Sequence, residues 1–170
     1  TQDKMFIRFS DQEDRTDYVP VSTNTAGTFQ LDSGSKIVSA ARGKDYIFIV
    51  TDTSAYIMQF VGPPFTFSIR QVGSNCGAMS QHSLVHVDGI MYWMGKSGGF
   101  YAYDGGSVKK LTCSVEDFVF TTQTSDDLGF NFGQSEQVFA GYNTLFTEIN
   151  WFYCKDGSTQ IDRCVTLNYR

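Results

Sequence analysis

Short runs of apolar residues, separated by turn residues, recur along the whole chain. Three of the clearest runs are Tyr46–Thr51, Ile90–Gly95 and Ile149–Cys154, and turns containing Ser-Gly, Gly-Gly or Asp-Gly stand between many of the others. Runs of about four to eight residues that are rich in β-branched and aromatic side chains are typical of strands joined by hairpins. The pattern therefore predicts an all-β chain.

One unit of this pattern is repeated. The run from Tyr46 continues through a turn into "AYIMQF", and 44 residues later "IMYWMG" continues through "KSG" into "GFYAYD". A third copy, "INWFYC", begins at Ile149, 59 residues after Ile90, and a partial copy, "KMFIRFSD", lies 41 residues before Tyr46. A strand of small apolar residues precedes each central pair, and an outer strand follows the first two. Four antiparallel strands repeating every ~40–45 residues are typical of β-propeller blades.

The repeat predicts a single domain over residues 1–170, built as an array of four-stranded blades. The expected blades cover residues 36–73, 83–113 and 137–170, and a partial blade covers 1–31. A short helix is expected at "SVEDFVF", capped by Ser114 with Asp117 at capping-box spacing, and a long surface loop at 121–136. Because a closed propeller has about four to eight blades, we expect the chain to be a fragment whose missing blades come from further chain or from partner subunits.

The stretch "MYWMGKSGGFYAYDGG", Met91–Gly106, raises the question of whether its aromatic residues are exposed or internal. Along "GFYAYD", Phe100 and Ala102 alternate with Tyr101 and Tyr103, so both faces of the strand are apolar. A sheet that is apolar on both faces must be covered on both, as in blades stacked face to face. The cluster is therefore predicted to be internal, with the tyrosine hydroxyls hydrogen-bonded or reaching the edge.

Composition and charge exclude several classes. The 170 residues are 41% hydrophobic and 15% aromatic, only 18% are charged, and the formal net charge is −5. A negative chain without a Lys/Arg run repels a phosphate backbone, so tight nucleic-acid binding is not expected. No uninterrupted apolar segment approaches the ~18 residues of a membrane-spanning helix, so no membrane insertion is expected.

Residues able to bind metals do not form a convincing site. His82 and His86 are four residues apart but have no third ligand nearby, and the acidic stretch from Asp11 to Asp17 lacks the turn glycine of a calcium loop. A solvated hairpin is the favoured interpretation of the acidic stretch. The four cysteines follow no C-x-x-C spacing. Cys154 and Cys164 flank a turn and either pair across a hairpin or, as we favour, stay free thiols.

No catalytic residue, metal or cofactor is predicted. Asp52, Glu116 and Asp117 are carboxylates of the kind that glycosidases use in pairs, but nothing in the sequence places them in one cleft. The stretch "SDQEDRTDY" is only a degenerate match to the Asp-box turn of sialidase-like propellers. The chain is therefore predicted not to be an enzyme.

Several stretches resemble a known family. They are "STNTAG" before "LDSGSKI", "QFVGPPFTF", "GSNCGAMSQHS" leading to "VDGIMYW", and "YAYDGG" before "KKL" and "VEDFVF". Over residues 10–120 the chain resembles the propeller region of the tail hub or nozzle proteins of short-tailed bacteriophages. The resemblance implies a structural subunit of the virion, arranged with other copies and neighbouring tail proteins around the channel through which DNA passes without tight binding. It supplies no catalytic residues.

Two surfaces are candidates for binding. In "GPPFTF", Pro63 and Pro64 end a strand, and Phe65 and Phe67 either pack under the neighbouring blade or are exposed anchors for an adjoining subunit. The alternative function is a carbohydrate-binding propeller, lectin-like or sialidase-like, that stacks sugars on Trp93, Trp151 and Tyr103. Repeated sugar sites need the same residue type in each blade, and the nearly aligned Ile47, Met91 and Asn150 differ in kind.

Overall fold

The computed structural model describes residues 3–121 and 129–170 and is all-β within them. Its strands run antiparallel and are short, apart from two of nine residues. The elements are β1 (Phe6–Phe9), β2 (Gly27–Gln30), β3 (Ile37–Arg42), β4 (Ile47–Thr51), β5 (Ser54–Gly62), β6 (Thr66–Ser74), β7 (Leu84–Val87), β8 (Ile90–Met94), β9 (Phe100–Tyr103), β10 (Val108–Lys110), α1 (Glu116–Phe120), the 3₁₀ helix η1 (Phe132–Gln137), β11 (Phe139–Asn143), β12 (Glu148–Tyr153) and β13 (Arg163–Asn168).

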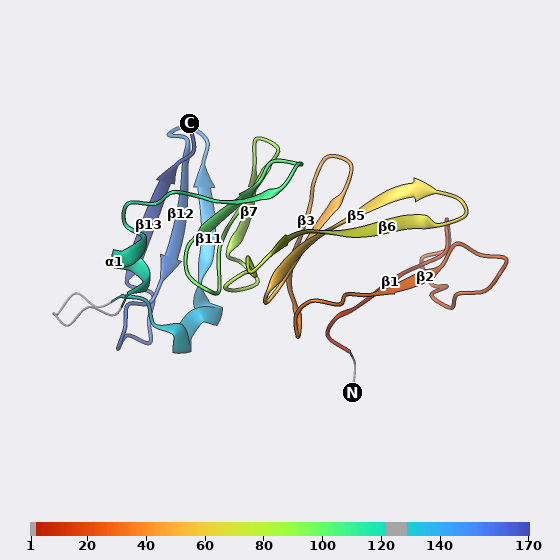
Figure 1. Cartoon of the computed structure of the whole chain (residues 1–170), viewed down its shortest axis with the longest axis horizontal. Helices are drawn as coiled ribbons and strands as arrows, with labels where there is room; N and C mark the ends of the chain where they lie inside the picture. The colour runs from red at the N-terminus through yellow and green to blue at the C-terminus, as the bar shows by residue number, and fades with distance from the viewer. Residues whose placement is uncertain (1–2, 122–128) are drawn as a thin grey trace.

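The strands form four separate antiparallel sheets in chain order. Sheet 1 is β1–β2, sheet 2 is β3–β4–β5–β6, sheet 3 is β7–β8–β9–β10 and sheet 4 is β11–β12–β13. In Figure 1 sheets 4, 3 and 2 follow one another from left to right along the long axis of the molecule, and sheet 1 lies below sheet 2 on the right. The predicted all-β class is confirmed. Two of the three expected four-stranded units have four strands, and the third, sheet 4, has three in the described part of the chain.

Apolar side chains fill the space between each pair of successive sheets. Three clusters of buried residues join sheet 1 to sheet 2, sheet 2 to sheet 3, and sheet 3 to sheet 4. Sheet 3 is covered on both faces: Met91, Trp93 and Tyr101 contribute to the cluster shared with sheet 2, whereas Tyr92 and Met94 contribute to the cluster shared with sheet 4. The prediction that the aromatic stretch is internal is confirmed, because period-2 alternation sends its apolar side chains to both faces.

The first strands of sheets 2, 3 and 4 lie next to one another. The Ser39 hydroxyl on β3 donates to the carbonyl of Gln81 just before β7 (2.8 Å). The Ala140 amide on β11 donates to the carbonyl of His82 (2.8 Å), and His82 and Phe139 form a parallel bridge. Within each sheet the strands are joined by hairpins and lie side by side in chain order. Each later strand therefore lies farther from the row formed by β3, β7 and β11.

The repeat is shifted by one residue in sheet 4 relative to the sequence alignment. Met91 and Trp93 face the preceding sheet, and so do Ile149 and Trp151, whereas Asn150 lies on the outward face. The correct displacement is therefore 58 residues, not 59. Since strand side chains alternate between faces, an error of one residue exchanges the two faces. The residues equivalent to Ile47 and Met91 include Ile149, so this position is apolar in all three sheets.

Two local predictions also need correction. The helix begins at Glu116 with Val115 as its N-cap and no side-chain cap, so the expected cap by Ser114 is wrong. The segment expected to be a long loop contains η1, where the Asn131 side chain accepts a hydrogen bond from the Gly133 amide (3.0 Å). Residues 122–128 of that loop lie outside the described residues.

Candidate interaction surface

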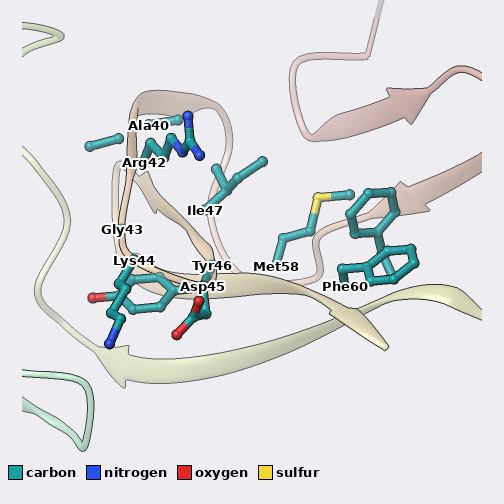
Figure 2. Close-up of a pocket in the computed structure, with 11 residues that line it drawn as sticks. Ala40, Arg42, Gly43, Lys44, Asp45, Tyr46, Ile47, Met58 and Phe60 are labelled. Carbon is teal, nitrogen blue, oxygen red and sulfur yellow. The ribbon is translucent and has the colours of Figure 1, made fainter. Parts of the chain in front are cut away.

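A hollow opens on the face of sheet 2 that points toward sheet 1. Sheet 1 has only two strands, and its apolar cluster with sheet 2 includes Ile37 of β3, Ile49 of β4 and Ile69 of β6. The part of the face around Arg42 and Ile47 is left open, and no residue of β1 or β2 lines it (Figure 2). The hollow is lined by Ala40, Ala41, Arg42, Gly43, Lys44, Asp45, Tyr46, Ile47, Met58, Phe60 and Phe67.

The exposure of Ile47 shows how incomplete the cover is. Ile47 is 40% exposed, whereas Met91, at the equivalent position of sheet 3, is 0% exposed beneath sheet 2. The neighbouring side chains Ala40 and Arg42 on β3 are exposed on the same face. The missing cover thus lies over one end of β3 and β4, around Arg42 and Ile47, whereas Ile49 on the same strand is buried.

A two-stranded arm projects beside the hollow. The pairing of β4 with β5 ends at Ile47 and Met58, but β5 and β6 continue as a hairpin over Gln59–Ser68, the arm. The arm contains no charged residue, and its Phe60 and Phe65 are 65% and 76% exposed. In Figure 1 the arm extends beyond the rest of sheet 2, on the side of the molecule where sheet 1 lies. One edge of β5 is therefore without a neighbouring strand along the arm.

The two predicted roles of the "GPPFTF" segment are divided between its residues. Pro63 and Pro64 form the turn of the arm, and Phe65 at the turn is exposed. Phe67 packs edge-on against Phe9 of sheet 1, with ring centroids 4.9 Å apart. Phe65 and Phe67 do not share a strand face, because β6 begins at Thr66, a non-glycine residue with positive φ that turns the chain between them.

The aromatic residues of the sugar-binding alternative are internal. Trp93 and Trp151 are fully buried, and each indole N–H donates to a backbone carbonyl, that of Cys76 (2.7 Å) and that of Ser83 (2.9 Å) respectively. The Tyr103 hydroxyl donates to the Gly105 carbonyl (3.0 Å). Their ring faces are covered by neighbouring side chains, so these three residues are not available for stacking on a ligand.

The remaining polar candidates do not gather into a site. Within residues 3–121 and 129–170, no group of three or more His, Cys, Asp or Glu side chains is placed to hold a metal. Asp52 is near Lys96 (3.8 Å), and Glu116 pairs with Lys110 (2.5 Å), so each carboxylate has its own cation. No helix in this part of the chain is long and apolar enough to cross a membrane.

The acidic stretch is an exposed turn held by its own side chains. Asp11 accepts hydrogen bonds from the Thr25 hydroxyl (2.6 Å) and amide (2.7 Å), and Asp14 accepts from the Thr16 hydroxyl (2.6 Å). These bonds lower the pKa of both carboxyl groups. The geometry agrees with the predicted solvated hairpin.

All four cysteines are free thiols. Cys164 pairs in register with Phe152, so Cys154 lies two residues beyond the cross-strand position that a disulfide across this hairpin would need. Burial raises the pKa of the Cys76 thiol to about 11, which keeps it protonated at neutral pH.

The junction between sheets 2 and 3 is closely packed, in contrast to the open face of sheet 2 that carries the hollow. The linker Cys76–Ala78 runs along the end of β4, and a Cβ at Gly77 would lie 2.1 Å from the carbonyl carbon of Asp52. Burial raises the pKa of Asp52, but hydrogen bonds from the Ser35 amide (2.8 Å) and hydroxyl (2.6 Å) outweigh burial, and the net shift is downward. This junction is closed, whereas the opposite face of sheet 2 is half open.

The sequence did not single out Arg42, Ile47 or Phe60 as surface residues. Ile47 has the pattern of an ordinary interior strand residue, because its exposure depends on how far the neighbouring sheet extends over it. A usable signal was present in the short partial unit before residue 31, which has too few strands to cover a complete four-stranded sheet.

No family model matches the chain, and no curated protein matches it.

Proposed function

We propose that this chain is a segment of a β-propeller that works as a structural assembly module, in the tail hub or nozzle of a short-tailed bacteriophage. It acts by shape and by contacts with other copies and neighbouring tail proteins, without turnover. Copies arranged around the channel form part of its wall, and the chain is located in the virion. The net charge of −5 suits a wall past which DNA moves without being held.

One observation carries the proposal: the first strands of three successive sheets lie side by side along one edge. β3, β7 and β11 are neighbours through the Ser39–Gln81 and Ala140–His82 hydrogen bonds. Sheets that radiate from adjoining first strands, with an apolar layer between each pair, are the arrangement expected of blades around an axis. A closed ring needs more such sheets.

Exposed apolar residues on sheets 2 and 4 support an assembly role rather than a self-contained one. At one end the face of sheet 2 is half open at Ile47, and at the other the outward face of sheet 4 carries the stacked pair Phe139 and Phe152, whose ring centroids are 4.7 Å apart. Exposed apolar surface at both ends of a stack favours contacts with further polypeptide. The sugar-binding alternative loses its stacking residues, since Trp93 and Trp151 are buried.

The test is the mass of the purified chain in solution, measured by size-exclusion chromatography with light scattering over a wide concentration range. We expect a mass above that of the 19.0 kDa monomer that rises with concentration. A monomer at all concentrations would contradict the assembly role.

A further inference from the structure

We propose that the hollow on sheet 2 is a docking site for the arm of a second copy of this chain, and that two copies exchange arms around a two-fold axis. The inference rests on the proposed assembly function and names its partner and its contact. In this dimer the tip of each arm, Pro63–Phe65, occupies the hollow beside Ile47 of the other copy.

The first support is the shape of the hollow. It is lined by residues 40–47 of the β3–β4 hairpin and by Met58, Phe60 and Phe67 of β5 and β6. β4 does not continue beside the arm, because its pairing with β5 ends at Ile47 and Met58. A strand that lies against the free edge of the arm therefore reaches the hollow with its end.

The second support is position. The arm begins where the hollow lies, because Met58 and Phe60 of β5 line the hollow and Phe60 is also part of the arm. The arm extends about four residues from this base, or ~13 Å. Two arms lying antiparallel therefore bring the tip of each to the base of the other. A patch that contains both the ligand and its site is self-complementary, as a two-fold interface requires.

The third support is the free backbone edge of β5. Along the arm, β5 is paired with β6 but no longer with β4, whose register with β5 ends at Ile47 and Met58. A strand edge of this kind is a template for pairing with another chain. Antiparallel pairing of two such edges would join the two arms into one four-stranded sheet.

The fourth support is that the contact would continue an interface already present. Phe60 and Phe67 pack edge-on with ring centroids 5.7 Å apart, and Phe67 packs in the same way on Phe9. This chain of rings runs from the layer between sheets 1 and 2 to the rim of the hollow. Phe65 of the second copy would extend the chain across Ile47, burying two side chains that are now exposed.

The charges around the two parts are complementary. Two cations, Arg42 and Lys44, and one carboxylate, Asp45, line the hollow, and neither cation has an ion pair with another described residue. The acidic turn 11–17 carries four acidic residues and one arginine, and it lies beside the arm, where Asp11 and Pro63 line a common surface depression. In the exchanged dimer the acidic turn of one copy approaches the basic rim of the other, which favours encounter and alignment.

The test uses cysteine cross-linking between two separately purified variants, with Cys164→Ser in both to remove the exposed native thiol. One variant carries Ile47→Cys and the other, with a size tag, carries Phe65→Cys. Because each has only one engineered cysteine, a disulfide between these positions must join two copies. We expect a mixed disulfide dimer on mild oxidation. The matched control replaces Ile47→Cys by Leu145→Cys, which is also exposed but lies at the β11–β12 turn, and should yield much less product.

A second measurement keeps the result independent of oxidation. Phe65→Ser should weaken self-association at least about tenfold by light scattering, since an aromatic anchor is lost, whereas Leu145→Ser should leave it unchanged. Association that persists in Phe65→Ser, with no more cross-linked product than the control, would overturn arm exchange while leaving the assembly function in place. A wild-type chain that stays monomeric would overturn both. Far-UV circular dichroism verifies that the variants fold.

Discussion

The two faces of sheet 2 have the same kind of residues but different surroundings. On the face toward sheet 3, Phe48 and Val50 are completely buried against Trp93 and its neighbours. On the face toward sheet 1, Ile49 is buried but Ile47, two residues away on the same strand, is 40% exposed. The difference lies in the neighbour: a four-stranded sheet covers the first face, and a two-stranded sheet covers half of the second. Apolar character at a strand position thus indicates a need for cover, and the adjacent sheet determines whether that need is met.

The largest expected effect comes from the matched pair Met91→Ala and Ile47→Ala. Met91 is fully buried beneath sheet 2, so Met91→Ala should lower the free energy of unfolding by about 2–5 kcal/mol, the usual range for a buried methionine. Ile47 occupies the equivalent position on the open face, and Ile47→Ala should cost less than about 1 kcal/mol in the monomer. Urea denaturation at low protein concentration measures both. Equal losses would mean that the open face is covered in solution.

A second prediction concerns the close packing of the linker Cys76–Ala78 against the end of β4. Gly77→Ala would place a Cβ against the backbone of Asp52, and the resulting overpacking should cost about 1–3 kcal/mol. Gly141→Ala is the control, because a Cβ at that position on β11 meets no atom within 4 Å. Thermal unfolding of the two variants should show a clear decrease in Tm for Gly77→Ala only. A Gly77→Ala variant with unchanged Tm would show that the linker can move away from β4.

The smallest expected effect is the pH dependence of the same junction. The folded-state pKa of Asp52 lies below its ordinary value of 3.8, so its ionised form stabilises the fold above that value. This stabilisation is lost as the pH falls through the folded-state pKa. Asp52→Asn should therefore be less stable than wild type at neutral pH, and the difference should shrink below about pH 4. Chemical denaturation across this range tests the sign, and a difference independent of pH would mean that the carboxylate charge has no part in the junction.

The sequence was sufficient to predict the strands and the interior, for physical reasons that hold locally. The apolar faces of the strand around Tyr101 and Tyr103 indicated burial on both sides, and the structure places these rings inside with their hydroxyls bonded to the carbonyls of Asn75 and Gly105. The misalignment at Asn150 arose because adjacent strand residues differ only in the face that they occupy. Aligning Trp93 with Trp151 would have avoided it.

The candidate surface depended on information that local patterns do not contain. Arg42, Ile47 and Phe60 come from three strands, and their exposure is set by how far sheet 1 extends over sheet 2 and by the extra length of β5 and β6. Phe65 was identified from its segment, but "GPPFTF" alone could not distinguish it from Phe67. The turn residue and the strand residue are separated by Thr66, whose backbone conformation is not specified by that short sequence.

The indole hydrogen bonds have a consequence for the order in which the chain folds. Trp93 bonds the carbonyl of Cys76 in the linker before its own sheet, and Trp151 bonds the carbonyl of Ser83 at the start of the sheet before its own. Each tryptophan therefore holds a segment that is synthesised earlier, and that segment gains this hydrogen bond only after the strand that carries the tryptophan has been synthesised. Amide hydrogens of β8 should be the last to exchange with solvent, and those of β1 and β13, at the two ends of the stack, the first.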